Sequence, residues 1–448
     1  MKKHFTLNEH KYLFVEKDES KQGWNEDGNV GIPEIVFNQI DQYVKQNDDE
    51  SSYFLKPGYR KGYKYILKAQ QYVGVIKTKS GVSVEILPKI SKIDYSERNK
   101  GSEGKTEKNQ EKVRKTFIKM LKRLKDSKYK QFQTASLNSC KMPLLELFIS
   151  MFLDELAILV RKGIRSDYIN KEENAPFLKG KLLMSKQIKH NYIHKERFFI
   201  SFDEYSPNRI ENKLIKSTLL FLNSKTSSNA NSKRIKENLF IFDLIDTSTN
   251  PKADFDKVKD NRNIKYYENV MSWCRMLLNN ESITPFKGDT VAFALLFDMN
   301  RIFEDYVAWW LKRKLSDKYD TFQAQDKGHH LIESHQKYKL KPDIVINGNI
   351  ILDTKWKLIK NVEKDISQAD LYQMYAYGKK YKNEDEKQNK LFLIYPMNEE
   401  LDKDKKKLEE THYYDNGKIL PLEVLFFDCG ADEKDGIKNI GDVVKIIK

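Results

Sequence analysis

The sequence predicts a mixed α/β protein of the α+β type, with a β-rich N-terminal part, a mainly helical middle region and a C-terminal part built on a mixed sheet. β-Branched segments separated by glycine turns are typical of residues 1–135, and apolar residues at helical spacing dominate residues 136–285. Helix and strand patterns alternate over residues 286–448, as in a sheet flanked by helices. At roughly 150 residues per domain, 448 residues have room for these three parts.

The composition is globular and basic. Lys and Arg number 80 against 65 Asp and Glu, which gives a net charge of +15. This charge favours binding to a polyanion such as nucleic acid, although a lysine-rich surface without special function explains it equally well. No apolar run approaches the ~20 residues of a membrane span, and residues 1–20 lack a secretory signal, so we expect no membrane association and a cytoplasmic location. Widely spaced Cys140, Cys274 and Cys429 argue against a disulfide framework or a zinc site.

The N-terminal elements are predicted from β-branched runs. Residues 63–67 form one strand, and residues 71–90 form a hairpin whose turn is Thr78-Lys79-Ser80-Gly81. Residues 95–110 are polar and of low complexity, and a short basic amphipathic helix follows near 117–124. We interpret the charged stretch near 95–131 as an insertion of unknown role.

The middle region is predicted to be helical. Residues 142–163 form a long apolar helix that ends at Gly163, and residues 210–223 form another. The polar segment 227–233 is interpreted as a surface loop, and residues 256–280 as mostly helical.

The last third begins with a long predicted helix over residues 291–315. The other elements expected there are strands at about 338–346, 350–358, 390–396 and 421–428 and a helix at about 366–381.

Asn347-Gly348 between two of these strands predicts a hairpin that brings acidic residues together. If residues 347–349 form the loop, Asp343 lies opposite Asp353. Alternation then places Asp353 and Lys355 on one face, while Thr354 and Trp356 point away. A two-residue loop would shift the register and place Asp343 diagonal to Asp353.

Two carboxylates and an ammonium on one patch suit phosphodiester hydrolysis. Carboxylate oxygens are ligands for Mg²⁺, which activates water and polarises a phosphoryl oxygen. An isolated match is weak, and a surface hairpin with solvated charges is the alternative. Here, however, the acids interrupt apolar strands, where an unpaired charge is costly, and a helix follows with Gln373 and Tyr377 one turn apart.

These motifs, Pro342-Asp343, Asp353-Thr354-Lys355 and Gln373-xxx-Tyr377, resemble the PD-(D/E)xK nuclease superfamily in its branch with a QxxxY motif. The resemblance implies a mixed sheet that cuts DNA with Mg²⁺. It also implies roles for single residues: Asp343 and Asp353 bind the metal, the Thr354 carbonyl can add a ligand, Lys355 positions the water, and Gln373 and Tyr377 support the site and the DNA backbone.

In the same superfamily the preceding helix often supplies a glutamate. Glu304 is the matching candidate in this sequence, and an exposed helical glutamate without a role is the alternative.

The similarity extends over most of the chain and narrows to the McrC family, the nuclease subunits of McrBC modification-dependent restriction systems. The segments that carry it are Tyr72-Val-Gly-Val-Ile, Glu85-Ile-Leu-Pro-Lys-Ile, Leu178-Lys-Gly-Lys-Leu, Asn208 with Asn212, Asn300-Arg-Ile-Phe-Glu-Asp-Tyr-Val, Lys341-Pro-Asp-Ile and Asp370-Leu-Tyr-Gln-Met-Tyr-Ala-Tyr.

This resemblance implies a GTP-dependent complex directed at modified cytosine. The N-terminal part would sit in the ring of a McrB-like AAA+ GTPase and stimulate it, the C-terminal part would cut DNA, and the partner would recognise the modified base. The sequence contains no GxxxxGK[ST] motif, so GTP would be bound by the partner.

Two other hypotheses remain open. One is a self-sufficient Mg²⁺-dependent nuclease in DNA repair or defence. The other is a non-catalytic assembly subunit with a decayed site, against which the intact Asp343, Asp353 and Lys355 argue. The sequence does not reveal the modified base, the stoichiometry or whether two copies meet to cut both strands. His329, His330 and His335, just before the first acidic strand, receive no role.

Overall fold

The fold is known from a computed structural model. It describes residues 3–46, 54–90, 103–124, 142–258, 262–278, 291–315, 319–332, 334–381, 389–397, 412–414 and 420–430. Residues 95–102 and 125–131 of the predicted insertion lie outside these residues, and so does Cys140. The chain divides into two compact units, Met1–Leu144 with Ser282–Lys448, and Leu145–Glu281. Across the described residues, helices and sheets are mixed as expected for the α+β class, and none of the helices is long and apolar enough to cross a membrane.

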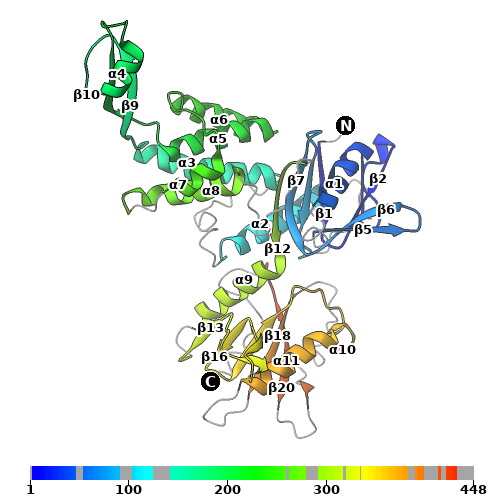
Figure 1. The fold of residues 1–448 in the computed structure, drawn as a ribbon. Helices are drawn as coiled ribbons and strands as arrows, with labels where there is room; N and C mark the ends of the chain where they lie inside the picture. Colours follow the sequence, from blue (N-terminus) through cyan, green and yellow to red (C-terminus); the bar gives the residue numbers. More distant parts are fainter. Residues whose placement is uncertain are drawn as a thin grey trace. The chain divides into compact units, whose positions relative to one another are not determined.

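Two sheets form the N-terminal part of the first unit. One has four strands in the order β1-β8-β7-β12 and the other has five in the order β3-β4-β2-β6-β5 (Figure 1). Their bounds are β1 His4–Asn8, β2 Tyr12–Val15, β3 Gly23–Trp24, β4 Val30–Ile32, β5 Leu55–Arg60, β6 Lys64–Ala69, β7 Tyr72–Thr78, β8 Ser83–Leu87 and β12 Val291–Asp298, with helices α1 Glu34–Gln46 and α2 Glu103–Leu121 and a 3₁₀ turn at Glu19–Lys21.

The predicted hairpin is confirmed as β7 and β8. Gly81 has a φ of +83° in its turn, a conformation that glycine adopts without steric cost. Gly74 has a φ of +145°, and a Cβ there would collide with the Leu295 carbonyl of β12. All residues of both strands are buried, so this hairpin is the centre of a sheet.

The predicted helix over 291–315 is wrong in its first third. Residues Val291–Asp298 form β12, which pairs antiparallel with β7, and helix α9 begins only at Met299 and ends at Lys314. A continuous apolar run fits a buried strand and a buried helix equally well, and the sheet partner decides between them. Asp298 then starts the helix, because its side chain accepts a hydrogen bond from the Asn300 backbone N–H.

Helix α2 begins earlier than the sequence predicts, at Glu103 within the polar segment. A buried ion pair joins it to the sheet: Arg114 donates to both Glu85 carboxylate oxygens at 2.7 and 2.8 Å. Burial opposes the charge of Glu85, but Arg114 outweighs it and lowers the pKa of this carboxyl to about 2. The Phe117 ring also packs 5.9 Å from Phe297 of β12.

A six-stranded sheet in the order β13-β16-β17-β18-β20-β19 forms the C-terminal part. Its strands are β13 Phe322–Ala324, β16 Ile344–Ile346, β17 Ile350–Thr354, β18 Lys390–Pro396, β19 His412–Tyr413 and β20 Pro421–Phe427, and its helices are α10 Val362–Asp365 and α11 Gln368–Lys380. The predicted 338–346 strand is in fact two, because residues Lys337–Lys339 form β15, which pairs with β14 (His330–Ile332) outside this sheet. The predicted 350–358 strand ends at Thr354.

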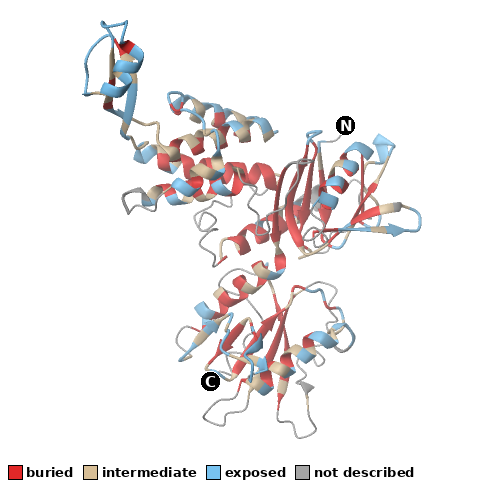
Figure 2. Cartoon of the chain, viewed as in Figure 1, coloured by how far each residue is buried: buried red, intermediate tan, exposed pale blue. Residues whose placement is uncertain are grey.

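The two faces of this sheet pack against different helices. On one face, Met374 and Tyr377 of α11 share a buried cluster with Ile351 and Leu393. On the other, the Phe427 ring contacts the rings of Phe303, Tyr306 and Trp310 of α9 at 5.6 to 6.0 Å. Figure 2 shows the buried residues that run along these central strands.

The second unit is mainly helical, as predicted. Its helices are α3 Leu144–Lys162, α4 Met184–Asn191, α5 Ile210–Lys225, α6 Asn229–Ile241, α7 Pro251–Lys257 and α8 Glu268–Leu278, with a 3₁₀ helix at Arg262–Tyr267 and a sheet of β9 Asp167–Ala175, β10 Lys181–Leu182 and β11 Phe198–Ser206. The loop predicted at 227–233 is wrong, because α6 begins inside it. Ser228 caps this helix, and the buried Asn231 donates to Glu146 at 2.8 Å, so its polar residues are start signals rather than loop residues.

Candidate active site

The β16–β17 hairpin has a three-residue loop, which is one of the two alternatives that the sequence leaves open. Ile346 pairs with Ile350 and Ile344 with Leu352, so the same register continued outward places Asp343 opposite Asp353. Asn347 and Gly348 have φ of +50° and +73°, as a tight hairpin turn requires. The Asn347 side chain also accepts backbone hydrogen bonds from Asp320 and Thr321, at 2.9 and 3.1 Å.

Asp353 is a buried acid in the centre of the sheet. Its strand pairs antiparallel with β16 and parallel with β18, and its side chain is 1% exposed. The carboxylate forms an ion pair with Lys355, and its Oδ1 has no hydrogen-bond partner in the described part of the chain. Burial, with the neighbouring Asp343 carboxylate, raises the pKa of Asp353 to about 7.

Asp343 is half-buried and turns toward the end of β17. Its Oδ2 accepts hydrogen bonds from the Thr354 backbone N–H at 2.6 Å and from the Thr354 hydroxyl at 2.7 Å. The prediction that the Thr354 side chain points away from the acids is therefore wrong. Asp343 precedes the first paired residue of β16, so strand pairing does not hold its side chain to the alternation of the sheet.

Lys355, Gln373 and Tyr377 form a hydrogen-bonded row beside the acids. Lys355 Nζ donates to Gln373 Oε1 at 2.9 Å, and Gln373 Nε2 donates to the Tyr377 hydroxyl at 2.7 Å. The Lys341 backbone N–H lies near the Tyr377 hydroxyl and acts to lower its pKa, which burial raises above the ordinary value. Burial acts to lower the pKa of Lys355, but the Asp353 and Asp343 carboxylates outweigh it, so the net shift is upward and the ammonium is retained.

The structure does not bring Glu304 into this cluster. Glu304 lies on α9, and its Oε1 accepts a hydrogen bond from Gln325 Nε2 at 2.8 Å. The Gln325 backbone N–H donates to the Asp343 carbonyl at 2.8 Å, so a glutamine connects Glu304 to the acids. In the described stretches, no three His, Cys, Asp or Glu side chains gather in a way that could hold a metal ion.

Sequence reasoning missed a second layer of polar residues behind the row. Asp370, 5% exposed, accepts from Lys357 Nζ at 2.7 and 3.0 Å and from the Tyr395 hydroxyl at 3.3 Å. Two signals were available: Lys357 lies two residues after Lys355, and Asp370 lies one helical turn before Gln373.

The residues present fit a hard divalent cation. Asp343 and Asp353 offer carboxylate oxygens, and the buried Asp353 Oδ1 lacks a hydrogen-bond partner in the described chain. Mg²⁺ is held in proteins by one or two carboxylates and keeps several waters, so two acids suffice. A cation would also offset the cost of two neighbouring acids in a buried place.

The fold and the site define a mixed α/β protein with two acids and a lysine in the middle of a six-stranded sheet. The chain belongs to the family described as McrBC 5-methylcytosine restriction system component, whose model matches residues 67–396. The matched range includes the β7–β8 hairpin and every residue of the candidate site. The chain is therefore a component of a restriction system of the McrBC type.

Two known proteins illustrate the similarity. The type IV methyl-directed restriction enzyme EcoKMcrBC of Escherichia coli K12 is 25% identical over 258 residues, which are 53% of this chain and 72% of the relative. A chain in the refined half-complex from the tetradecameric assembly of Thermococcus gammatolerans McrB AAA+ hexamers with bound McrC matches with a TM-score of 0.68 and 20% identity. That match covers 99% of both chains, and at this identity it concerns the fold alone.

Proposed function

We propose that this chain is the DNA endonuclease subunit of a McrBC-type restriction complex and that it hydrolyses phosphodiester bonds with Mg²⁺. The observation that carries the proposal is the connected row Asp353–Lys355–Gln373–Tyr377 beside Asp343. In this row Asp353 and Tyr377 are buried and Lys355 and Gln373 are half-buried. Burying charged and polar groups in this way is costly to a fold, which favours a catalytic use over a structural one.

Each residue of the site has a distinct role in this proposal. Asp343 and Asp353 would hold Mg²⁺, which polarises the phosphoryl oxygen and lowers the pKa of a bound water. Lys355, held between Asp353 and Gln373, orients the attacking water and offsets negative charge on the phosphate. Thr354 holds Asp343 in place through its backbone N–H and hydroxyl, and its carbonyl remains a candidate ligand. Glu304 would have to change its contact with Gln325 to join Asp343 and Asp353 as a metal ligand.

Tyr377 and Gln373 position Lys355 rather than react. The Gln373 amide accepts from the ammonium with its oxygen and donates to the Tyr377 hydroxyl with its nitrogen, which fixes the orientation of the amide. Lys355 therefore reaches the site with few accessible rotamers, which reduces the entropy lost on catalysis.

The proposal includes an AAA+ GTPase partner that binds the GTP. The similar T. gammatolerans chain comes from McrB AAA+ hexamers with bound McrC, and our sequence has no phosphate-binding GxxxxGK[ST] motif. The family description and the methyl-directed E. coli relative favour DNA with 5-methylcytosine as the target. We assign contact with the GTPase partner to residues 1–135. Because the β7–β8 strands are buried, exposed side chains elsewhere in this part would form the contact surface. A cytoplasmic location remains a prediction.

Replacement of Asp353 tests the proposal. In Asp353→Asn, GTP-dependent cleavage of methylated DNA should fall by at least on the order of 10²-fold, while co-purification with the GTPase ring stays unchanged. Equal loss of ring binding would contradict the division of labour. Cleavage by the wild-type chain alone, with Mg²⁺ and without nucleotide, would favour the self-sufficient nuclease instead.

A further inference from the structure

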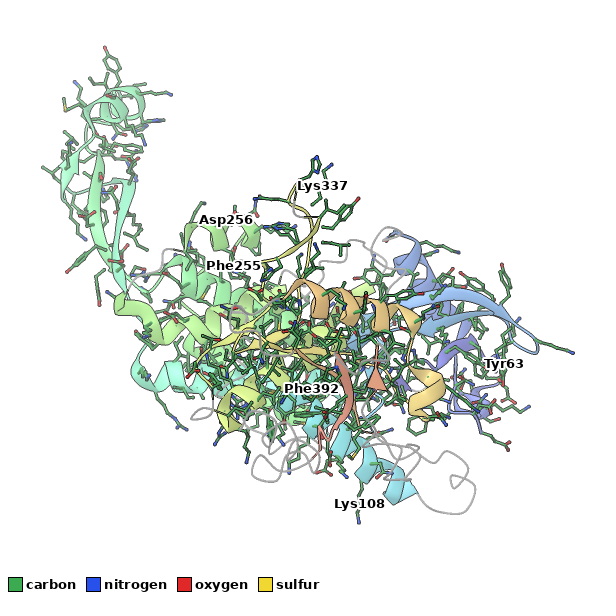
Figure 3. All side chains as sticks on the ribbon, turned by 90° about the horizontal axis from the view of Figure 1, so that it is seen from below. Tyr63, Lys108, Phe255, Asp256, Lys337 and Phe392 are labelled. Carbon is green, nitrogen blue, oxygen red and sulfur yellow. The ribbon has the colours of Figure 1, made fainter. Side chains whose placement is uncertain are left out.

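An exposed two-stranded ribbon precedes the candidate active site. Strands β14 (His330–Ile332) and β15 (Lys337–Lys339) pair antiparallel, with His330 opposite Lys339 and Ile332 opposite Lys337. All three residues of β15 are exposed, and Figure 3 shows Lys337 on a hairpin that stands out from its surroundings. Such a ribbon has no core of its own, so packing does not explain its composition.

The charge of this ribbon is strongly positive. Residues 327–341 contain four lysines, Lys327, Lys337, Lys339 and Lys341, against a single acid, Glu333. Lys337, Lys339 and Lys341 are all exposed, and none forms an ion pair with a carboxylate of the described residues. We define these three lysines as the basic ribbon.

The base of the ribbon is fastened to the helix that carries Gln373. The Tyr377 hydroxyl of α11 lies near the Lys341 backbone, and the Tyr381 ring lies 4.3 Å from the His329 ring. The Tyr381 hydroxyl donates to Asp326 at 2.6 Å, which holds the segment that enters β14. The Leu340 backbone N–H also donates to the His329 carbonyl at 2.9 Å, so both ends of the ribbon are held together.

The ribbon is close to the acids along the chain. Asp343 lies four positions after Lys339 in the sequence, a distance of at most about 14 Å even for a fully extended chain. Phosphates follow one another every ~3.4 Å of axis along each DNA strand, so this reach spans about four nucleotides.

We propose that the basic ribbon binds the phosphate backbone of duplex DNA beside the bond to be cut. This proposal rests on the proposed function, because it assigns the residues that bind DNA next to the same active site. Flexible, solvated lysines on a ribbon contact phosphates without reading bases, so this grip is independent of sequence. The ribbon holds DNA next to Asp343 and Asp353, while the partner recognises the modified base.

DNA binding by the full chain tests the proposal in an Asp353→Asn background, where DNA stays intact. The parent is compared with K337Q/K339Q/K341Q by fluorescence anisotropy on a short duplex over a range of salt concentrations. The slope of log affinity against log salt should become shallower by about 2.7, because each phosphate contact contributes about 0.9. Affinity near 0.1 M salt should fall by about tenfold or more.

Two control variants give the result its meaning. K337R/K339R/K341R keeps the charge and should retain the affinity and slope of the parent. K56Q/K61Q/K68Q removes as many exposed lysines from the β5–β6 hairpin and should leave both nearly unchanged. Circular dichroism of every variant confirms the fold.

Three results would overturn the proposal: no DNA binding by the parent at low salt, an unchanged slope in the glutamine variant, or an equal loss in the β5–β6 control. Failure of the proposed function looks different. In that case Asp353→Asn would still cut DNA with the partner present, whatever the ribbon variants do in the binding assay.

Discussion

At Asp353, burial and charge act against each other. The side chain is almost fully enclosed, and Asp343 lies across the hairpin, so the charged form is disfavoured and the pKa rises to about 7. The Lys355 ammonium acts to lower the pKa of Asp353 and so offsets part of this rise. We therefore expect the site to bind a divalent cation, because the cation would relieve the repulsion between the two acids.

The identity of these residues was predictable from the sequence, but some of their contacts were not. The Asn347-Gly348 turn predicted the hairpin, and of the two registers that it allowed, the structure has the one that brings Asp343 opposite Asp353. The Thr354 hydroxyl bond to Asp343 was missed, since alternation rules hold only inside the paired strand. The position of Glu304 depends on how α9 packs against the sheet, and a local sequence pattern does not predict this packing.

Gln373→Ala tests the positioning role at this scale. Loss of the amide frees Lys355 on one side, so the cleavage rate with partner and GTP should fall about 10-fold to 100-fold, with KM for DNA little changed. Single-turnover kinetics measure the effect. Tyr372→Ala, one residue earlier on α11 and exposed, is the matched control and should retain the wild-type rate. A wild-type rate in Gln373→Ala would remove this residue from the site.

At the scale of elements, the wrong secondary-structure predictions share one cause, which is a local pattern that fits two kinds of element equally well. The run at 291–297 is apolar on every residue, so its periodicity does not distinguish a strand from a helix, and only its antiparallel pairing with β7 decides. Segment 227–233 is polar because its Ser228 and Asn231 cap and anchor a helix, which composition alone does not distinguish from a loop. By contrast, the strand at 390–396 was predicted within its observed bounds.

Arg114→Met tests how α2 is attached to the sheet. It removes two hydrogen bonds from Glu85 and leaves a buried carboxylate without its cation, so the free energy of unfolding should fall by about 3–5 kcal/mol. Urea denaturation measures the change. Lys115→Met, the exposed neighbour, should have little effect, and Glu85→Gln added to Arg114→Met should recover much of the loss. A neutral Arg114→Met would show that apolar contacts hold the helix.

At the scale of the whole first unit, one contact joins residues far apart in the sequence. Trp356 Nε1 donates to both carboxylate oxygens of Glu9 at 3.0 Å, and the Lys89 backbone N–H donates to Glu9 Oε2 at 3.0 Å. The turn after β1 thus touches the residue that follows Lys355. No local pattern predicts a contact of this range, and its existence couples the N-terminal sheets to the candidate site.

Glu9 makes stability depend on pH. Burial raises its pKa from 4.5 to about 7, even though Lys89 and Trp356 act to lower it. Between these values the folded chain binds more protons than the unfolded chain, so the free energy of unfolding falls as pH rises from about 4.5 to 7, by about 3 kcal/mol in total.

Glu9→Gln should remove this part of the pH dependence, because glutamine does not titrate. We expect it to unfold at a higher temperature than the wild type at pH 8 and to narrow the difference between pH 5 and pH 8 in thermal melts. The Asp353 shift acts in the same direction in both proteins, so the comparison isolates Glu9. Glu19→Gln, an exposed control, should follow the wild type. Parallel curves for Glu9→Gln and wild type would show that Glu9 is ionised throughout.

The central claim is that Asp343 and Asp353 form a metal-dependent DNA-cleaving site. Its most direct test is the single-turnover cleavage rate of methylated DNA, with the GTPase partner and GTP, as Mg²⁺ is titrated. We expect a saturating Mg²⁺ dependence in the wild type and in the exposed Asp320→Asn control, and a loss of at least on the order of 10²-fold in Asp343→Asn at every Mg²⁺ concentration. A wild-type rate in Asp343→Asn, or full cleavage without a divalent cation, would contradict the account.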